Sequence, residues 1–149
     1  MKICVISDSH GNTNDLEKVL SNTTYNHIFF LGDGERDFEY FLNDDRVTMI
    51  EGNCDLYSPY PLLETKEING VKIMLCHGHL YNVRQGIYSL LKKGINLGAK
   101  IICYGHTHIQ SIQNESGIWV VNPGALNMGK ALEIEINERK EIKFNPIQF

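Results

Sequence analysis

Five short runs of apolar residues are the feature that most constrains how this chain can fold. They are rich in β-branched and aromatic side chains, a composition typical of buried strands. The runs cover residues 2–7, 27–32, 46–52, 72–76 and 100–105. None approaches the roughly 20 apolar residues that a membrane helix needs. We therefore expect buried sheets and no membrane partner.

Helical patterns lie between these runs. Apolar residues follow the i, i+3, i+4 spacing of a helix face within residues 14–22, with Asn14 as the expected N-cap. Two further patterns cover residues 83–95 and 36–42. The first half of the chain is thus β/α in character.

Turn signals dominate the second half. Asn69-Gly70, residues 114–117 and residues 137–139 each separate two strand-like segments, which predicts antiparallel hairpins. Crossovers followed by hairpins favour two sheets packed face to face with helices outside. We find no internal repeat or linker and expect a single domain over residues 1–149.

The charge balance limits the partners. The formal net charge is −4 without a block of lysine or arginine, so the electrostatic footprint for duplex nucleic acid is missing. The apolar stretch in the first ten residues is too short for a signal peptide. We expect a cytoplasmic location, and the oligomeric state, a homo-oligomer included, is left open.

The four cysteines are far apart in the sequence and form no CxxC pair. Cys4, Cys76 and Cys103 lie inside apolar runs, where a free thiol behaves as a small buried hydrophobe. We expect these three to be reduced core thiols in a reducing compartment.

Each of the five apolar runs ends in residues of metal-ligating type that stand next to a glycine. Binding sites in α/β sheets lie at the carboxyl ends of strands, so these side chains can converge. Burying so many polar groups for packing alone would cost several kcal/mol, and the pattern therefore predicts a metal site. The candidate ligands are Asp8, His10, Asp33, Asn53, His77, His106 and His108.

The number of candidate ligands decides the kind of site. A structural zinc site takes four ligands and is usually rich in cysteine. Seven ligands, one of them bridging, supply four to each of two ions and leave positions for water and substrate. We expect two divalent metal ions, manganese first, with nickel, iron, cobalt or zinc as alternatives.

The motifs DSH, GD, GN, HGH and GHTH, in this order, resemble the calcineurin-like metallophosphoesterase superfamily. The short chain resembles its small YfcE-like phosphodiesterase branch, over Met1 to about Ala125. The resemblance implies an α/β fold, a β-sandwich of two mixed sheets flanked by helices. It also implies how the ligands divide: Asp8, His10 and His108 on one ion, Asn53, His77 and His106 on the other, and Asp33 bridging the two.

The resemblance further implies a dinuclear metal-dependent phosphodiesterase that hydrolyses small-molecule phosphodiester substrates through a metal-bridging hydroxide. One alternative is a phosphomonoesterase on the same site. The other is a non-catalytic protein-interaction scaffold of the retromer-subunit type. In such a scaffold we expect the ligand set to be eroded, notably at the DxH histidine, but His10 is present.

Cys54 marks a departure from the larger members of the superfamily, which have the histidine of a GNH motif beside the leaving group. A thiol is a poor substitute for imidazole as a proton donor near neutral pH. Three other residues are therefore candidates for catalytic contacts. They are His79, which follows the ligand-type residue His77, Asp55, and Asn12, which either touches a phosphate oxygen or caps the following helix.

Overall fold

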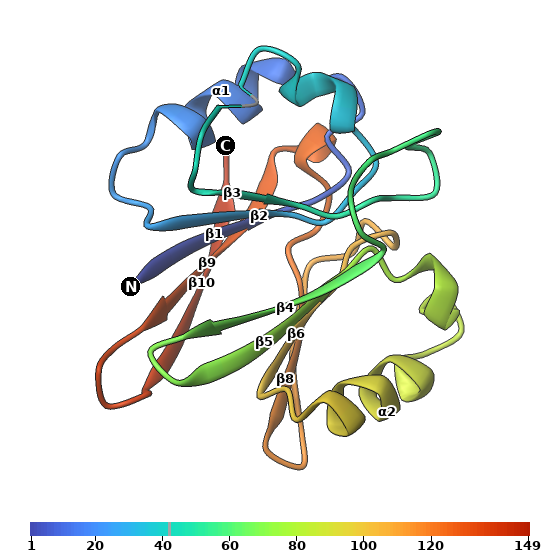
Figure 1. The fold of residues 1–149 in the computed structure, drawn as a ribbon, viewed down its shortest axis with the longest axis vertical. Coiled ribbons are helices and arrows are strands. Elements are labelled where there is room, and N and C mark those ends of the chain that lie inside the picture. Colours follow the sequence, from blue (N-terminus) through green and yellow to red (C-terminus); the bar gives the residue numbers. More distant parts are fainter. Residues whose placement is uncertain (42) are drawn as a thin grey trace.

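Two five-stranded mixed β-sheets pack face to face, and the helices cover their outer faces (Figure 1). The structure is a computed structural model that describes residues 1–41 and 43–149. The architecture confirms the predicted α/β sandwich of two mixed sheets flanked by helices.

The first sheet joins the beginning of the chain to its end. Its strand order is β10-β9-β1-β2-β3. Strands β1, β2 and β3 run parallel to one another, β9 pairs antiparallel with β1, and β10 pairs antiparallel with β9. The strands are β1 (Lys2–Ile6), β2 (His27–Phe30), β3 (Val47–Met49), β9 (Lys130–Ile136) and β10 (Ile142–Gln148).

The second sheet has the order β4-β5-β6-β8-β7, with parallel strands at its centre and an antiparallel strand at each edge. All three predicted hairpins are present, and Asn69 and Gly70 both have positive φ, as a two-residue turn requires. The strands are β4 (Leu63–Ile68), β5 (Val71–Cys76), β6 (Ile101–Cys103), β7 (Ser111–Glu115) and β8 (Ile118–Asn122).

The helices correct three details of the sequence prediction. Helix α1 (Thr13–Ser21) is capped by Asn12, not Asn14, because the Asn12 side chain accepts the Asp15 N–H. Helix α2 (Tyr88–Leu97) starts five residues after position 83, since Gly86 has a φ of 135°, which no right-handed helix contains.

The pattern over residues 36–42 forms only the short 3₁₀ helix η1 (Glu35–Phe38), and Leu42 lies outside the described residues. Two more 3₁₀ turns, η2 (His79–Tyr81) and η3 (Leu126–Met128), follow β5 and β8. These short turns stand beside the ligand-bearing loops, where the chain leaves the sheets.

Successive side chains of the central strands point to opposite faces of the sheet, and both faces are buried, so the apolar runs are continuous. In β1, Ile3 and Val5 belong to the core between the sheets, whereas Cys4 and Ile6 belong to the core beneath α1. Strand β5 repeats the arrangement, with inner residues between the sheets and outer residues beneath α2. Both faces of each sheet are covered, so both sets of side chains are apolar.

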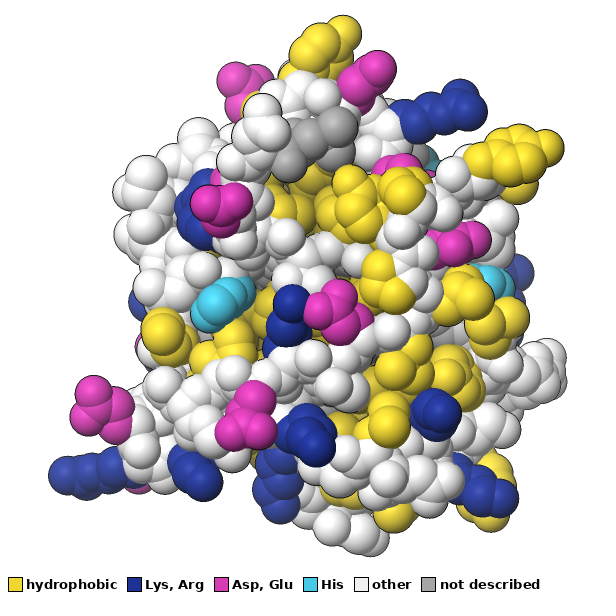
Figure 2. Space-filling view, viewed as in Figure 1, with side chains coloured by type: hydrophobic (Ala, Val, Ile, Leu, Met, Phe, Trp, Pro, Cys, Tyr) yellow, Lys and Arg dark blue, Asp and Glu magenta, His cyan; other side chains and the backbone are white. Residues whose placement is uncertain are grey.

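The surface carries mixed charge. Figure 2 shows acidic and basic side chains interspersed on one face of the molecule, without a basic block. Among the described residues, no helix has the length and apolarity that a membrane crossing demands.

The cysteine environments give a test of the packing. Cys4, Cys76 and Cys103 are buried and Cys54 is exposed. Burial raises the pKa of Cys4 and of Cys76 to about 12, so neither forms a thiolate near neutral pH. We expect a thiol reagent to modify Cys54 alone in the native protein, and all four thiols after unfolding.

The absorbance after reaction with an aromatic disulfide reagent measures the number of modified thiols per chain. Partial burial and the charge of Asp33 raise the pKa of Cys54, so its reaction should be slower than that of glutathione. The control, Cys54→Ser, should leave the native protein unreactive. Native modification of more than one thiol per chain would contradict the burial of the core cysteines.

Candidate metal centre

The structure brings the seven candidate ligands together at the carboxyl ends of five strands. Four of the ligands lie in the loops after β1, β2 and β3 of the first sheet, and three lie in the loops after β5 and β6 of the second sheet. Six of the seven form two groups of three, in each of which the donor atoms lie within 4.8 Å of one another, and Oδ1 of the seventh, Asn53, lies 3.1 Å from Nε2 of His77. One group is Asp8, His10 and His108, and the other is Asp33, His77 and His106.

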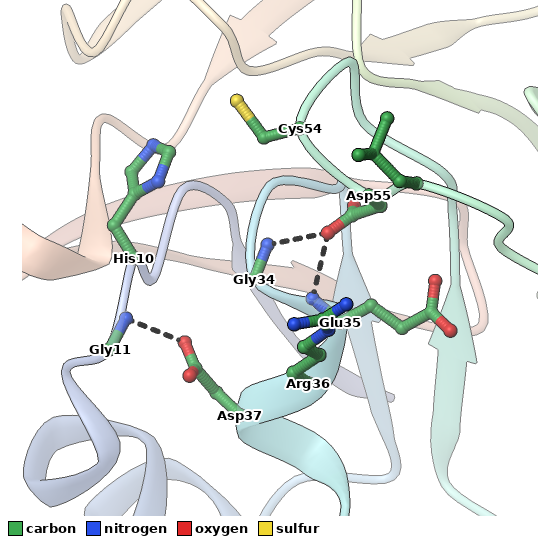
Figure 3. Close-up of a pocket in the computed structure, with 9 residues that line it drawn as sticks. His10, Gly11, Gly34, Glu35, Arg36, Asp37, Cys54 and Asp55 are labelled. Carbon is green, nitrogen blue, oxygen red and sulfur yellow. Dashed lines mark hydrogen bonds between the residues drawn. The ribbon is translucent and has the colours of Figure 1, made fainter.

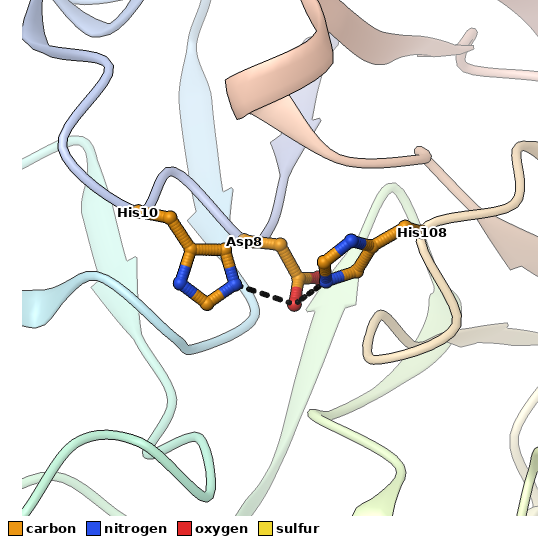
Figure 4. Close-up of side chains that lie close together, drawn as sticks. All are labelled: Asp8, His10 and His108. Atoms are coloured by element: carbon orange, nitrogen blue, oxygen red, sulfur yellow. Dashed lines mark hydrogen bonds and ion pairs between the residues drawn. The ribbon is translucent and has the colours of Figure 1, made fainter.

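The first group is built around Asp8. Its Oδ1 lies 2.9 Å from Nε2 of His108 and 3.6 Å from Nε2 of His10 (Figure 4). Its Oδ2 accepts the Ser7 hydroxyl at 2.6 Å and the His106 N–H at 3.1 Å. One oxygen is therefore fixed by the protein, and the other faces two imidazoles.

The second group divides its carboxylate in the same way. Oδ1 of Asp33 accepts the Cys54 N–H at 2.8 Å, while Oδ2 lies 3.3 Å from Nε2 of His77. The same Oδ2 is 4.0 Å from Nε2 of His10, which belongs to the first group. Oδ2 of Asp33 thus lies near an imidazole of each group.

His77 is held in a defined tautomer. Its Nδ1 lies 2.7 Å from the Leu31 carbonyl oxygen, which can only accept, so Nδ1 carries the hydrogen. Nε2 then faces Oδ1 of Asn53 at 3.1 Å and Nδ1 of His106 at 3.2 Å. This fixing of the far nitrogen is how proteins orient histidine ligands of metals.

The pKa values of Asp33 and His77 shift in the directions of an ion pair. Burial opposes ionisation of Asp33, but bonds from His77 and the Cys54 N–H outweigh it and lower the pKa of Asp33. Burial also opposes charge on His77, yet Asp33 and then Asp8 raise the pKa of His77. The space between these groups therefore stabilises positive charge.

Divalent cations fit this donor set. Several lone pairs converge, from Oδ1 of Asp8, Oδ2 of Asp33, the Asn53 carbonyl oxygen and four imidazoles. Such a convergence is favourable only with a positive charge at its centre. Mixed imidazole, carboxylate and amide donors suit manganese, iron, nickel, cobalt and zinc.

The backbone at the ligands is strained. A non-glycine residue in the left-handed region costs about 1–2 kcal/mol, and such residues gather at functional sites. Aspartate and histidine tolerate the conformation better than most. Five of the seven candidates adopt it: Asp8 (φ 55°), His10 (φ 40°), Asp33 (φ 62°), His106 (φ 67°) and His108 (φ 61°).

Two glycines let the loops meet. A Cβ on Gly32 would lie 2.6 Å from the Cα of Gly52, so the loops after β2 and β3 touch backbone to backbone. The Gly32 carbonyl also accepts the Asp8 N–H at 2.9 Å. Three strand ends are thereby drawn to one point.

Asp55 has a different role from the catalytic contact expected from the sequence. Oδ1 accepts the N–H groups of Gly34 and Glu35 at 2.9 and 3.0 Å (Figure 3). Oδ2 accepts those of Asp33 and Gly52 at 2.7 and 2.8 Å. Both oxygens are occupied by backbone donors. Asp55 is a positioning residue that holds the Asp33 turn.

The two other candidates for catalytic contacts, Asn12 and His79, differ in how far their polar atoms are already bonded within the protein. The Asn12 amide caps α1 and donates to Asp15 and to the Leu126 carbonyl, so its capping role is the one the structure supports. Nδ1 of the half-buried His79 is buried and has no protein partner among the described residues. Its ring centroid lies 5.4 Å from that of His77 and 6.2 Å from that of His106.

Two supporting residues were missed by the sequence analysis. Ser7 is fully buried and bonds Asp8, while the buried Asn122 donates to the Gly105 carbonyl and to Thr107 beside the histidines. Each is a polar residue at the end of an apolar strand, and that signal could have identified both.

A β-sandwich with paired groups of acid and imidazole ligands at its strand ends defines the metallophosphoesterase class of fold. The chain belongs to the calcineurin-like phosphoesterase superfamily, whose domain model matches residues 1–135. The predicted family is confirmed. A probable metallophosphoesterase of Bacillus subtilis, YsnB, is 26% identical over 137 residues, covering 91% of this chain and 80% of the relative.

Solved structures share the fold. A conserved protein of Streptococcus pneumoniae, described as a predicted phosphoesterase, has a TM-score of 0.77 at 24% identity, covering 99% of this chain and 97% of its own. A Vps29 variant of Entamoeba histolytica has a TM-score of 0.80 at 20% identity, covering 100% and 99%. An archaeal phosphodiesterase has a TM-score of 0.76 at 21% identity, covering 99% and 100%. At these identities the likeness concerns the fold alone.

The role of Asp55 can be tested by Asp55→Asn. The amide keeps one acceptor oxygen but places an NH₂ group against two backbone donors. We expect a loss of about 3 kcal/mol in the free energy of unfolding and about 10- to 100-fold weaker manganese binding. Urea unfolding and calorimetric titration measure the two effects.

Glu138→Gln, an exposed carboxylate in the β9–β10 turn, is the matched control and should change neither quantity. Asp55→Asn with unchanged stability and unchanged metal affinity would contradict the positioning role.

Proposed function

We propose that this chain is a metal-dependent phosphodiesterase that hydrolyses small phosphodiesters at a dinuclear centre. The observation that carries the proposal is the position of Asp33. Its free oxygen faces imidazoles of both ligand groups, 3.3 Å from His77 and 4.0 Å from His10. Two ions sharing one carboxylate would lie at the short separation that clamps both oxygens of a displacement.

The charge of such a centre favours a phosphate ester. Two divalent ions bring four positive charges, and Asp8 and Asp33 are the carboxylates among the candidate ligands. The remaining positive charge would attract an anionic diester. When bound, the ions supply Lewis acidity, which polarises the phosphoryl oxygen and lowers the pKa of a coordinated water.

The residues of this chain supply position and protons. The Leu31 carbonyl orients His77, and the Ser7 hydroxyl and the His106 N–H fix one oxygen of Asp8. The proposed reaction needs no protein nucleophile, because the attacking oxygen comes from water. We assign the donation of a proton to the leaving oxygen to the half-buried His79, whose ring centroid lies 5.4 Å from that of His77.

Three observations favour a diesterase over the alternatives. The chain belongs to a phosphoesterase family, and one structure with its fold is described as a phosphodiesterase. Cys54 stands where a leaving-group histidine is expected in protein phosphatases. The candidate ligands come together with donor atoms facing one another, which a non-catalytic scaffold would not need.

Manganese is the proposed metal, and the buried free thiols agree with a reducing, cytoplasmic location.

The hydrolysis itself is the central test. Protein stripped of metal should be inactive, and manganese should restore cleavage of bis-p-nitrophenyl phosphate at a higher kcat/KM than that of p-nitrophenyl phosphate. His106→Ala and Asp33→Asn should each lower kcat/KM by about 100-fold or more, since each removes a ligand. Release of p-nitrophenolate provides the measurement.

His27→Ala, a histidine at the start of β2 outside the centre, is the matched control and should retain activity. Full activity after metal removal would sink the proposal. A higher kcat/KM for p-nitrophenyl phosphate than for the diester would support the phosphomonoesterase alternative instead.

The assignment of His79 predicts a dependence on the leaving group. His79→Gln should slow release of an alkoxide by about 100-fold, the usual contribution of general-acid catalysis, and that of p-nitrophenolate by less than about threefold. Methyl p-nitrophenyl phosphate and a dialkyl phosphate provide the two leaving groups. Manganese affinity should be unchanged. Equal slowing of both leaving groups would remove His79 from proton transfer.

A further inference from the structure

A second cavity, of about 430 Å³, opens beside the metal centre between the loop after β5 and the loop after β6. These two loops carry His77, His79, His106 and His108. Their backbones are tied by the Gly105 N–H, which donates to the His77 carbonyl at 2.9 Å. The cavity therefore shares its walls with the ligand-bearing loops.

The contact at Gly78 shows how close the cavity comes to the ligands. Gly78 stands between His77 and His79, and a Cβ there would lie 3.1 Å from Val83 and 3.4 Å from the Tyr104 ring. Val83 and Tyr104 both line the cavity. The wall of the cavity thus packs directly on the residue between two histidines of the centre.

The lining has the chemistry of a small-molecule site. Val83, Ile87, Tyr104 and Ile109 supply an apolar wall. Ser111 adds a buried hydroxyl that has no protein partner among the described residues. A few polar groups set in an apolar cavity is the usual composition of a ligand pocket, and a buried hydroxyl favours a ligand atom that bonds it.

Arg84 supplies the charge of this cavity. Its exposed side chain lines the cavity, and the lining residues include no acid. Arg84 belongs to the loop that carries His77 and His79, and Thr107, which stands between His106 and His108, lines the same cavity. A cation on the wall of a cavity next to the ligand-bearing loops suits the phosphate end of an ester.

The cavity on the other side of the centre has a different character. It has a volume of about 310 Å³, and its lining includes His10, Cys54 and the charged residues Glu35, Arg36, Asp37 and Asp55 (Figure 3). A lining with several charged side chains suits a small polar group better than an apolar ring. Of the two cavities, the one at Ser111 is therefore matched to a ring.

We propose that the cavity at Ser111 is a subsite for an aromatic substituent of the diester. The ring packs against Ile87, Tyr104 and Ile109, a polar atom on it bonds the Ser111 hydroxyl, and Arg84 contacts the phosphate. The assignment rests on the proposed function, because it names the substrate class of that centre. A diester with an aromatic alcohol, such as an aryl or nucleoside group, is the substrate class.

The test fills the cavity and compares two ligands in the manganese-loaded protein. Ile87→Trp should raise KM for bis-p-nitrophenyl phosphate about tenfold, within the range that pocket contacts provide. The inhibition constant of dimethyl phosphate, which has no ring, should change by less than about twofold. Ser111→Ala should raise the same KM severalfold and also spare dimethyl phosphate.

Ile95→Trp is the matched control, because Ile95 is an exposed residue of α2 that does not line the cavity, and it should change neither constant. An unchanged KM in Ile87→Trp would overturn the subsite. An equal loss of both ligands would overturn it as well, since that result indicates a disturbed metal centre.

A measurement without turnover separates this proposal from the proposed function. Addition of diphenyl phosphate to the full chain should shift the ¹³C-methyl signals of Ile87 and Ile109 and leave that of Ile95 in place. Shifts in a protein that hydrolyses no ester would retain the subsite and refute the phosphodiesterase. Hydrolysis with unmoved Ile87 and Ile109 signals would refute the subsite and retain the phosphodiesterase.

Discussion

Two buried carboxylates, each with one oxygen fixed by the protein and the other facing imidazole nitrogens, are the constraint on which the rest of this structure depends. Asp8 and Asp33 are almost fully buried, and a buried charge is tolerated only with partners. Ser7 and the His106 N–H hold Asp8, and the Cys54 N–H holds Asp33. The free oxygens then create a position for cations that the fold must keep in place.

The sandwich meets this requirement by rigidity. Parallel strands of both sheets end at the same edge, and apolar cores on both sides of each sheet fix where those ends lie. The remaining freedom is in the turns, and there hydrogen bonds decide: four backbone N–H groups converge on Asp55, and Asn122 holds the Gly105 carbonyl. The favourable packing of the core thus offsets the backbone strain at five ligand residues.

Sequence reasoning was most successful where one residue type has one chemistry. The strands, the hairpins and the candidate ligands follow from periodicity and from acids and imidazoles at strand ends, and six of the seven candidates lie in two close groups. It could not decide between roles where a side chain has several uses. Asp55 and Asn12 carry the same functional groups as ligands or catalysts, but the first binds backbone N–H groups and the second caps a helix.

The sequence by itself determined the class of fold, the family and the set of residues able to bind cations, because each depends on local pattern and side-chain chemistry. Only the tertiary structure decided that Asp55 binds backbone N–H groups, that Nε2 rather than Nδ1 of His77 points to the centre, and that a cavity opens at Ser111. These properties depend on distances between segments far apart in the chain. Such distances are set by the packing of the two sheets, and no local pattern encodes them.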